Sequence, residues 1–369
     1  MACPIEAIET TTAGAIGVTE RGPTQPVLVT SFTEFIGTFG GSSPEPARDR
    51  SDADPSAAGD WSRFPLYVKG FFDNGGQRLY VIRAVGPPGQ AVDVSDFLAA
   101  IDLLNEVDDV ALCLVPGICA AGVQGALVEQ CARRRDRFAL LDAPEGLDIP
   151  GALNFRRPRD TSFAALYYPW LCVAAPLGAS SVSVAPSAYV AGILARVDRE
   201  RGMRTGIAGE PIRGATGITR SLSDADSAQL AAEGINPLRA LPRHGIVVWG
   251  ARALSRDPEW KYVNVRRLFI FIEKSIDRGT QWVVFEPNGE ALWACVRESV
   301  SDFLFRLWRA GELPGAKPDE AFFVRCDRTT MTQENLDQGR LVCLVGVAPL
   351  RPAEFVTFRI GQWTDDHKQ

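Results

Sequence analysis

The clearest pattern along the chain is the helical spacing of apolar residues in its last third. Between Glu290 and Ala310 they recur every three or four positions, which predicts an amphipathic helix with one buried face. A second stripe with the same spacing predicts a helix over Asn264–Arg278. Further on, Glu354–Trp363 alternates between apolar and polar residues, which predicts a strand with one apolar face.

The middle of the chain alternates between predicted strands and helices. Val110–Val115 is an apolar run typical of a buried strand, Gly122–Arg135 has helical character, and Arg137–Asp142 is a second apolar strand. Two strands bridged by one helix within about thirty residues predict a parallel βαβ unit. Further strands are predicted at Ile5–Glu20, Val27–Thr30, Arg78–Val85, Phe163–Tyr168, Ser181–Val184, Ile246–Trp249, Gln281–Phe285, Ala321–Cys326 and Leu341–Val347, and further helices at Leu66–Phe72, Val94–Glu106 and Ser187–Arg199.

Caps and loops complete the prediction of a mixed α/β fold. Ser31 and Ser95 are predicted helix N-caps, because serine at the start of an apolar-periodic stretch satisfies free backbone N–H groups. Gly40–Asp60 is rich in Gly, Ser, Pro and charge and lacks apolar periodicity, which predicts a mobile loop. Gly202–Asn236 is polar, and we expect few regular elements there.

Composition narrows the class of protein. Hydrophobic residues make up 46% of the chain and charged residues 23%, which predicts a sizeable core. The net charge of −6 gives no reason to expect nucleic acid or an anionic membrane as a partner. Arginine far outnumbers lysine, 34 to five, and its planar charged group suits contacts between proteins.

Cysteine usage and the N-terminus indicate where the protein folds. The eight cysteines form no C-x-x-C pair and mostly lie in apolar runs, so we expect free thiols in a reducing compartment. Met1–Glu9 has no apolar core of a secretory signal, and no stretch approaches the roughly 18 apolar residues that span a bilayer. These features predict folding in the cytoplasm.

Candidate catalytic and metal-binding residues are few. His244 follows Arg243 in a predicted turn, His367 lies in a polar tail, and neither has Cys, Asp or Glu at metal-ligand spacing in a structured element. The carboxylate pairs Asp257/Glu259 and Glu286/Glu290 are interpreted as a turn and a helix N-terminus. We therefore predict no enzyme activity, no catalytic residue, no metal site and no cofactor. An enzyme or small-molecule-binding site within Val94–Arg199 remains a remote alternative.

Long collinear motifs resemble the phage tail sheath family, including sheaths of extracellular contractile injection systems. The resemblance covers nearly the whole chain and is weakest at Gly40–Asp60. In the C-terminal third it rests on His244–Arg252, Asp257–Leu268, Phe285–Asn288, Phe323–Asp327, Thr329–Gln333, Gly339–Leu341 and Pro352–Val356, and earlier on Thr19–Pro23, Val29–Phe32, Gly70–Gly76 and Arg133–Pro144.

The resemblance implies a structural protein that stacks as a helical homo-oligomer in tiers of six around an inner tube. It implies contraction that drives the tube through a target membrane, with baseplate and tail-terminator or cap proteins as further partners. Nucleic acid and direct membrane insertion are not implied. Assembly would take place in the cytoplasm, followed by presence in a phage tail or a released extracellular particle.

The resemblance also implies a domain organisation. Residues 1–22 would be an N-terminal strand segment that joins the inner domain, and residues 23–243 an outer, more variable α/β domain that carries the mobile loop 40–60. Residues 244–369 would form the C-terminal, inner and polymerising sheath domain. The expected fold is thus a C-terminal sheet-and-helix domain with an α/β domain inserted before it.

Two sets of site residues follow from this organisation. The terminal strand is our candidate for pairing with the sheet of a neighbouring subunit; the alternative is that it closes the sheet of its own subunit. A polar segment, Thr332–Gly339, is a candidate for facing the tube, the alternative being a solvated turn. The inter-subunit strand candidates are Glu354, Phe355, Val356, Thr357, Phe358, Arg359 and Ile360, and the tube-facing candidates are Glu334, Asp337 and Arg340.

One departure from the family motivates an alternative. Family members commonly carry an arm upstream of the region that matches Ile5–Thr12, and this sequence begins at Met1. The alternative is a minor or capping sheath-like paralogue that does not polymerise alone.

Overall fold

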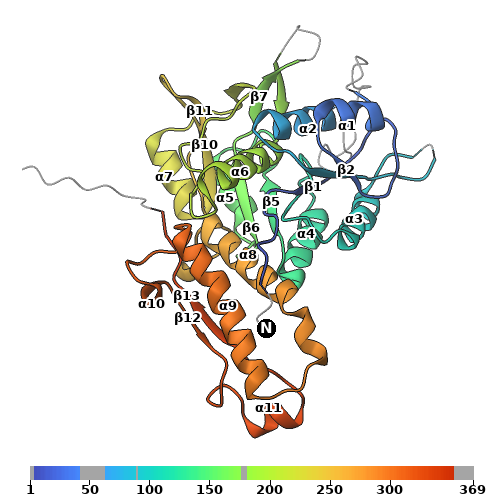
Figure 1. Ribbon diagram of the computed structural model, residues 1–369. Helices are drawn as coiled ribbons and strands as arrows, with labels where there is room; N and C mark the ends of the chain where they lie inside the picture. The colour runs from blue at the N-terminus through green and yellow to red at the C-terminus, as the bar shows by residue number, and fades with distance from the viewer. Residues whose placement is uncertain (1–3, 42–62, 89, 176–180, 353–369) are drawn as a thin grey trace, which may run out of the picture.

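A large, mostly parallel sheet forms the centre of the protein. The computed structural model describes residues 4–41, 63–88, 90–175 and 181–352 (Figure 1). Eight strands lie in the order β11-β10-β6-β5-β4-β1-β3-β2. They are β1 (Ala13–Gly17), β2 (Val27–Val29), β3 (Leu79–Arg83), β4 (Leu112–Leu114), β5 (Phe138–Asp142), β6 (Ala164–Tyr168), β10 (Ile235–Leu241) and β11 (Gly245–Val248).

The inner strands of this sheet pair in parallel, whereas β2 and β11 pair antiparallel with their neighbours. Every residue of β1, β5 and β6 is buried, as expected for parallel strands covered by helices on both faces. The predicted βαβ unit is confirmed: β4 and β5 pair in parallel, with Leu112 opposite Phe138, and α4 (Ala121–Arg134) bridges them.

Helices pack against the sheet in pairs. On one side α2 (Phe64–Asp73) packs on α6 (Ser187–Arg201), and a Cβ atom at Gly70 would lie 2.3 Å from the Tyr189 ring, so only glycine allows this approach. On the other side α3 (Val94–Leu103) packs on α4, as right-handed crossovers require. The remaining elements of this part are α1 (Phe32–Phe39), η1 (Leu104–Glu106), α5 (Ile149–Arg156), α7 (Asp224–Ala232) and a three-stranded sheet of β8 (Ser181–Val184), β7 (Leu171–Ala174) and β9 (Ala215–Ile218).

The C-terminal part projects from the large sheet and has its own hydrophobic core (Figure 1). The predicted amphipathic helices are confirmed as α8 (Val263–Gly279) and α9 (Glu290–Arg309). Leu292, Val296, Val300, Phe303 and Leu304 of α9 are buried in that core. The other elements here are η2 (Pro258–Trp260), η3 (Gln281–Phe285), α10 (Pro318–Ala321), β12 (Phe322–Arg325), α11 (Gln333–Asp337) and β13 (Leu344–Val347).

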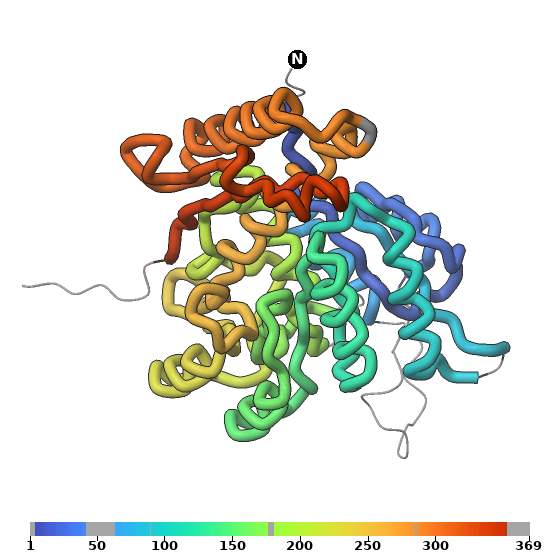
Figure 2. The backbone as a smooth tube through the Cα atoms, turned by 90° about the horizontal axis from the view of Figure 1, so that it is seen from below, coloured from blue at the N-terminus to red at the C-terminus, as the bar shows by residue number. Residues whose placement is uncertain are grey.

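The N-terminal segment connects the two parts. Ile5 is buried in the C-terminal core and β1 lies in the middle of the large sheet, so the described chain from Pro4 onward runs from the C-terminal part into the sheet (Figures 1 and 2). At the other side, β11 is an edge strand of the large sheet. The domain boundaries at 22/23 and 243/244 stay predictions about how the sheath is organised.

Several predictions of local structure are wrong. Gln281–Phe285 is a 3₁₀ helix rather than a strand, because the chain continues to turn after α8: the N–H of Val283 donates to the carbonyl of Thr280. Ser95 is not the cap of α3; Asp93 is, and both the N–H and the hydroxyl of Ser95 donate to its carboxylate. The Ser31 cap is confirmed.

The polar segment Gly202–Asn236 contains β9 and α7, which the sequence did not predict. A capping box starts α7, in which Ser223 and Asp226 accept each other's backbone N–H groups. Residues 42–60 of the predicted loop lie outside the described part of the chain. None of the helices in that described part is long and apolar enough to cross a membrane.

Candidate assembly surface

The small sheet of the C-terminal part offers two unpaired edges. Strands β12 and β13 pair with each other alone among the described residues, with Phe322 opposite Val347 and Arg325 opposite Leu344. The N–H of Ala348 donates to the carbonyl of Ala321, so these two residues form a hydrogen-bonded pair. Hydrogen-bonded and non-hydrogen-bonded pairs alternate along an antiparallel ladder, which makes Val324 and Val345 a non-hydrogen-bonded pair. It follows that the backbone groups of Val324 and Val345 point away from the ladder, toward the free edges.

One face of this sheet is packed and the other is exposed. Val324 and Val345 pack against the C-terminal core beneath α9. On the opposite face, Phe323 covers Gly346, where an added Cβ atom would lie 2.1 Å from the Phe323 ring. The Arg325 guanidinium lies 5.5 Å from the centre of the same ring. The exposed face therefore carries an aromatic side chain with a cationic one beside it.

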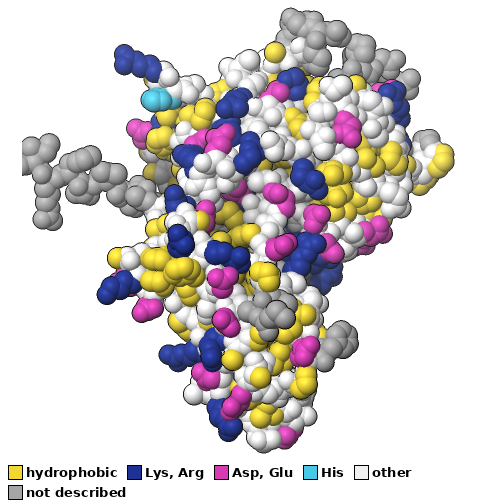
Figure 3. Space-filling view, in the orientation of Figure 1, with side chains coloured by type: hydrophobic (Ala, Val, Ile, Leu, Met, Phe, Trp, Pro, Cys, Tyr) yellow, Lys and Arg dark blue, Asp and Glu magenta, His cyan; other side chains and the backbone are white. Residues whose placement is uncertain are grey.

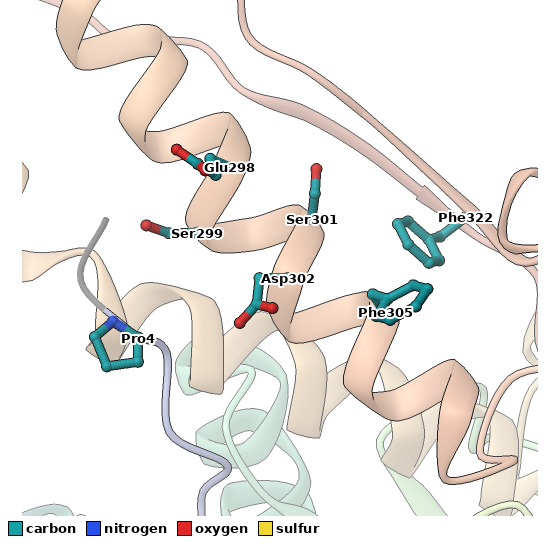
Figure 4. A pocket seen from close by; sticks show the side chains of 7 residues that line it. All are labelled: Pro4, Glu298, Ser299, Ser301, Asp302, Phe305 and Phe322. Atoms are coloured by element: carbon teal, nitrogen blue, oxygen red, sulfur yellow. The ribbon is translucent and has the colours of Figure 1, made fainter. Parts of the chain in front are cut away.

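A groove of about 460 Å³ runs beside α9 (Figure 4). The rings of Phe305 and Phe322 lie at one end, Pro4 lies at the other, and Asp302 lies between them (Figure 4). Glu298, Ser299 and Ser301 complete the lining. Arg306 fixes the N-terminal segment beside the groove, because its guanidinium donates to the carbonyl of Ile5 at 2.7 Å. The groove is thus apolar at one end and acidic along its side.

Exposed apolar side chains gather on this part of the protein. Of the seven large apolar side chains that are most exposed in the described part, four belong to α9, β12, β13 or the residues beside them, namely Phe305, Phe323, Val342 and Leu344. The space-filling view shows apolar side chains beside α10 as well (Figure 3). Exposed apolar side chains gathered on one part of a protein are a common feature of interaction sites.

The tube-facing candidates lie together at the far end of the C-terminal part (Figure 1). Thr332 caps α11, and Glu334 and Asp337 are exposed on that helix. Arg340 follows the helix and is also exposed, with its carbonyl accepting from the Asn288 side chain at 3.1 Å. The structure brings these three exposed residues together at one tip.

The strand candidates Glu354–Ile360 lie outside the described residues. The chain that leads to them is fixed at its start: Asn264, near the beginning of α8, donates to the carbonyl of Leu350 at 3.2 Å. Pro352 packs near Gly206, 3.6 Å from the place where a Cβ atom would be. Any strand formed by these residues therefore begins from a defined point on the C-terminal part.

The predicted carboxylate pairs have structural contacts. Asp257 accepts the N–H of Glu259 at the start of η2, and Glu290 forms an ion pair with Arg328. His244 lies exposed in the turn between β10 and β11. Within the described residues, no group of three or more His, Cys, Asp or Glu side chains is placed to hold a metal ion.

Asp142, at the end of β5, is a buried carboxyl group with a raised pKa. Burial raises its pKa to about 6, although three hydrogen bonds oppose the shift. Its carboxylate accepts from the hydroxyl of Ser187 at 2.7 Å, from the N–H of Ser187 at 2.9 Å and from the N–H of Gly117 at 3.1 Å. These contacts hold the start of α6 against the sheet, which is a structural role.

The groove residues were missed at the level of sequence. Phe305 lies off the buried stripe of α9, between the buried Leu304 and the exposed Arg306. An aromatic residue on the polar face of a strongly amphipathic helix was the available signal. Phe322 and Pro4 come from other segments, so their arrival at the same groove depends on the tertiary fold.

A mixed α/β protein with a small, open-edged sheet on a projecting C-terminal part is built for association. Comparison with known proteins gives its family. The phage tail sheath protein central domain matches residues 90–254, and the phage tail sheath C-terminal domain matches residues 255–362. The chain belongs to the phage tail sheath family, and both the sequence resemblance and the predicted fold class are confirmed.

Relatives and solved structures agree along almost the whole chain. A putative prophage major tail sheath protein of Pseudomonas aeruginosa (strain UCBPP-PA14) is 25% identical, over 92% of this chain and 87% of its own. The anti-feeding prophage baseplate structure contains a chain that is 28% identical with a TM-score of 0.79, covering 99% of this chain and 96% of that one. A sheath complex of an extracellular contractile injection system in its contracted state also reaches 28% and 0.79, covering 99% and 94%.

Proposed function

We propose that the protein is a sheath subunit that polymerises in stacked six-membered tiers around an inner tube, and contracts to drive the tube through a target membrane. The observation that carries the proposal is the open β12–β13 sheet, with one unpaired edge on each strand among the described residues. The similarity of this chain to subunits of contracted-state sheath structures supports the same function.

The terminal residues Glu354–Ile360 are our candidates for filling such an edge in a neighbouring subunit. An extended segment added to a sheet edge gains backbone hydrogen bonds, and its alternating side chains fix the register. When the donor and acceptor surfaces differ, the contact is head-to-tail and propagates into an open helix. Joints of this kind tolerate rotation of the rigid parts, while side-chain contacts elsewhere break and re-form to give two arrangements.

The tip that carries Glu334, Asp337 and Arg340 is our candidate for contact with the tube protein. Its side chains are charged and exposed, which suits a surface that must release when the sheath contracts. The proposal includes assembly in the cytoplasm, baseplate and cap proteins as neighbours at the two ends, and a place in a phage tail or an extracellular particle.

A minor or capping sheath-like paralogue is the second candidate. The observation that favours it is the similarity to a chain in a baseplate structure, which matches this chain as well as the sheath complex does. Such a subunit would sit at one end of the particle and would not polymerise alone.

Co-expression with the tube protein and negative-stain electron microscopy separates the two candidates. Striated hollow cylinders with sixfold end views are expected for a polymerising subunit. Monodisperse particles in the presence of assembled tube would select the capping role.

Two truncations test the strand candidates within the same experiment. A chain that ends at Pro352 should remain folded and form no cylinders, whereas a chain that ends at Trp363 should assemble like the full chain. Cylinders from the shorter chain would exclude Glu354–Ile360 as the joint.

A further inference from the structure

Two cysteines lie opposite each other where the β12–β13 ladder ends. The register runs from Phe322 opposite Val347 to Arg325 opposite Leu344, so the next pair along the two strands is Cys326 and Cys343. The N–H of Ala348 donates to the carbonyl of Ala321, and hydrogen-bonded and non-hydrogen-bonded pairs alternate along the ladder. Cys326 and Cys343 are therefore a non-hydrogen-bonded pair. In such pairs the Cα atoms are about 4.5 Å apart, which is within the range that a disulfide bond requires.

Contacts on both sides of the pair hold the two segments together. On one side is the ladder itself. On the other, the Thr330 hydroxyl donates to the carbonyl of Val342 at 2.9 Å, and the N–H of Val342 lies 3.2 Å from the Met331 sulfur. Both cysteines are free thiols, and their sulfur atoms are hydrogen-bond partners. The thiols therefore meet without any rearrangement of the backbone.

We propose that Cys326 and Cys343 form a reversible disulfide bond when the folded protein meets a low-molecular-weight disulfide oxidant. Cys343 is partly exposed and Cys326 is fully buried, which sets the order of events. The Cys343 thiolate attacks one sulfur of the oxidant, the oxidant's S–S bond breaks, and one small thiol leaves. The Cys326 thiolate then attacks the Cys343 sulfur and releases the second small thiol.

The exchange is balanced. Two protein thiols lose two protons and two electrons to form one S–S bond, and one small disulfide gains them to become two small thiols. A reducing compartment reverses the reaction, so the pair remains as thiols during folding and assembly there.

Two further features slow the reaction. Burial raises the pKa of the Cys343 thiol to about 12, and burial also raises the pKa of Cys326. The thiolate is the reactive form, and only a small fraction of each cysteine is thiolate at neutral pH, so the reaction is slow. The site is suited to slow oxidation in an oxidising environment rather than to rapid redox signalling.

The bond would close the loop 327–342. This loop carries α11 and the exposed residues Glu334, Asp337 and Arg340. A cross-link at its base restricts the conformations open to the loop and fastens β12 to β13 at the end of the ladder. The inference rests on the register and contacts of the pair and not on the proposed function.

A second sulfur pair in the same chain provides a matched control. Cys113 of β4 and Cys131 of α4 are also hydrogen-bond partners, but both are fully buried in the core beneath the helices. A small oxidant has no exposed sulfur to attack there. We therefore expect oxidation at Cys326 and Cys343 and not at this inner pair while the protein is folded.

The test uses the full chain, purified under reducing conditions and then treated with oxidised glutathione at pH 8. After quenching, the protein is denatured, free thiols are alkylated, and peptides are mapped by mass spectrometry. We expect a peptide that links Cys326 to Cys343, with circular dichroism unchanged. The C326S variant should retain glutathione on Cys343, and the C113S variant should form the same link as the unmodified sequence.

Two results would overturn the proposal. One is complete alkylation of both cysteines after treatment that leaves the unmodified chain folded. The other is a link from Cys343 to a cysteine other than Cys326. Both are read on the unmodified sequence, so a variant that fails to fold does not affect the decision.

Discussion

Arg267 of α8 and Asp198 of α6 form a buried ion pair, with Arg267 Nη2 lying 2.6 Å from Asp198 Oδ2 and the two side chains 4% and 3% exposed. Thr10 completes the cluster: its hydroxyl donates to Asp198 at 3.0 Å, and its carbonyl accepts from Arg267 at 2.9 Å. The cluster joins the N-terminal segment to α6, which packs on the large sheet, and to α8, whose residues contribute to both hydrophobic cores. We therefore expect the two parts of the subunit to move as one body.

Replacing Arg267 by methionine should strongly destabilise the fold. The substitution leaves the Asp198 carboxylate buried with Thr10 as its remaining partner, and an uncompensated buried charge costs about 3–5 kcal/mol of unfolding free energy. Urea denaturation followed by the fluorescence of the eight tryptophans measures the effect.

The matched control for this prediction is Arg278, on the same helix. It pairs with Asp109 at 3.6 Å, and its side chain is 68% exposed, so its substitution by methionine should cost less than about 1 kcal/mol. The double variant R267M/D198L should recover part of the loss, because it removes both buried charges. Equal effects of R267M and R278M would show that the buried cluster does not fasten the two parts.

The carboxyl group of Asp142 should make stability depend on pH between about 4 and 6. Burial raises its folded-state pKa to about 6, above the ordinary value of an aspartic acid near 3.8. The folded state therefore holds a proton in this range that the unfolded state has released, and stability falls as the pH rises. A shift of about two pH units corresponds to about 3 kcal/mol, most of it lost by pH 6 and nearly all of it by pH 7.

The D142N variant separates this group from all others that titrate. Asparagine keeps the size of the side chain and has no proton to release in this range. The difference in unfolding free energy, unmodified minus D142N, should decrease from pH 4 to pH 6 and stay level above pH 7. Parallel pH profiles of the two proteins would mean that Asp142 does not carry the shifted pKa.

Elements with a strong period were predictable from the sequence. The stripe on α9 is long and amphipathic, and the predicted range 290–310 differs by one residue from Glu290–Arg309. The βαβ unit was predictable because two apolar runs flank one helix. These patterns depend on the local spacing of apolar residues, and the tertiary fold changes the bounds of the elements little.

The elements that were missed depend on tertiary context. The sequence of β10 contains Asn236 and Pro237, which favour a turn, yet it pairs with β6 and β11 because the Asn236 side chain donates to Leu166 and Arg252 carbonyls. The Trp-Val-Val-Phe run of η3 looks like a strand, but it directly follows α8 and stays helical. The groove beside α9 joins segments far apart in the sequence, so no local pattern predicts it.

Proline substitutions should identify which edge of the small sheet accepts a neighbouring strand. The N–H groups of Val324 and Val345 point away from the β12–β13 ladder, so proline at either site preserves the ladder and removes one outward donor. If the β12 edge is the joint, V324P abolishes cylinder formation and V345P does not; the reverse identifies β13. Negative-stain electron microscopy of co-expressed sheath and tube gives the result.

Alanine variants at the same positions control for lost side-chain packing. V324A and V345A keep the N–H group, and both should assemble. Circular dichroism of all four variants, each expressed without the tube protein, must match that of the unmodified chain. Normal cylinders from both proline variants would show that neither edge takes part in assembly.

Neutralising the acidic side chains of α11 should weaken tube attachment without preventing folding. Glu334 and Asp337 are exposed, and their hydrogen bonds, to Gln338 at 3.1 Å and Gln333 at 2.8 Å, remain available to amides. Two exposed charges at an interface contribute about 1–2 kcal/mol together, so E334Q/D337N should reduce binding of sheath to preformed tube about tenfold. Co-sedimentation of the sheath subunit with preformed tube at low salt measures the loss of binding.

The control is D102N/E106Q, which removes two exposed acidic side chains near α3. It has the same net charge as the test variant and should bind like the unmodified chain. If the two double variants bind equally, the tip does not face the tube.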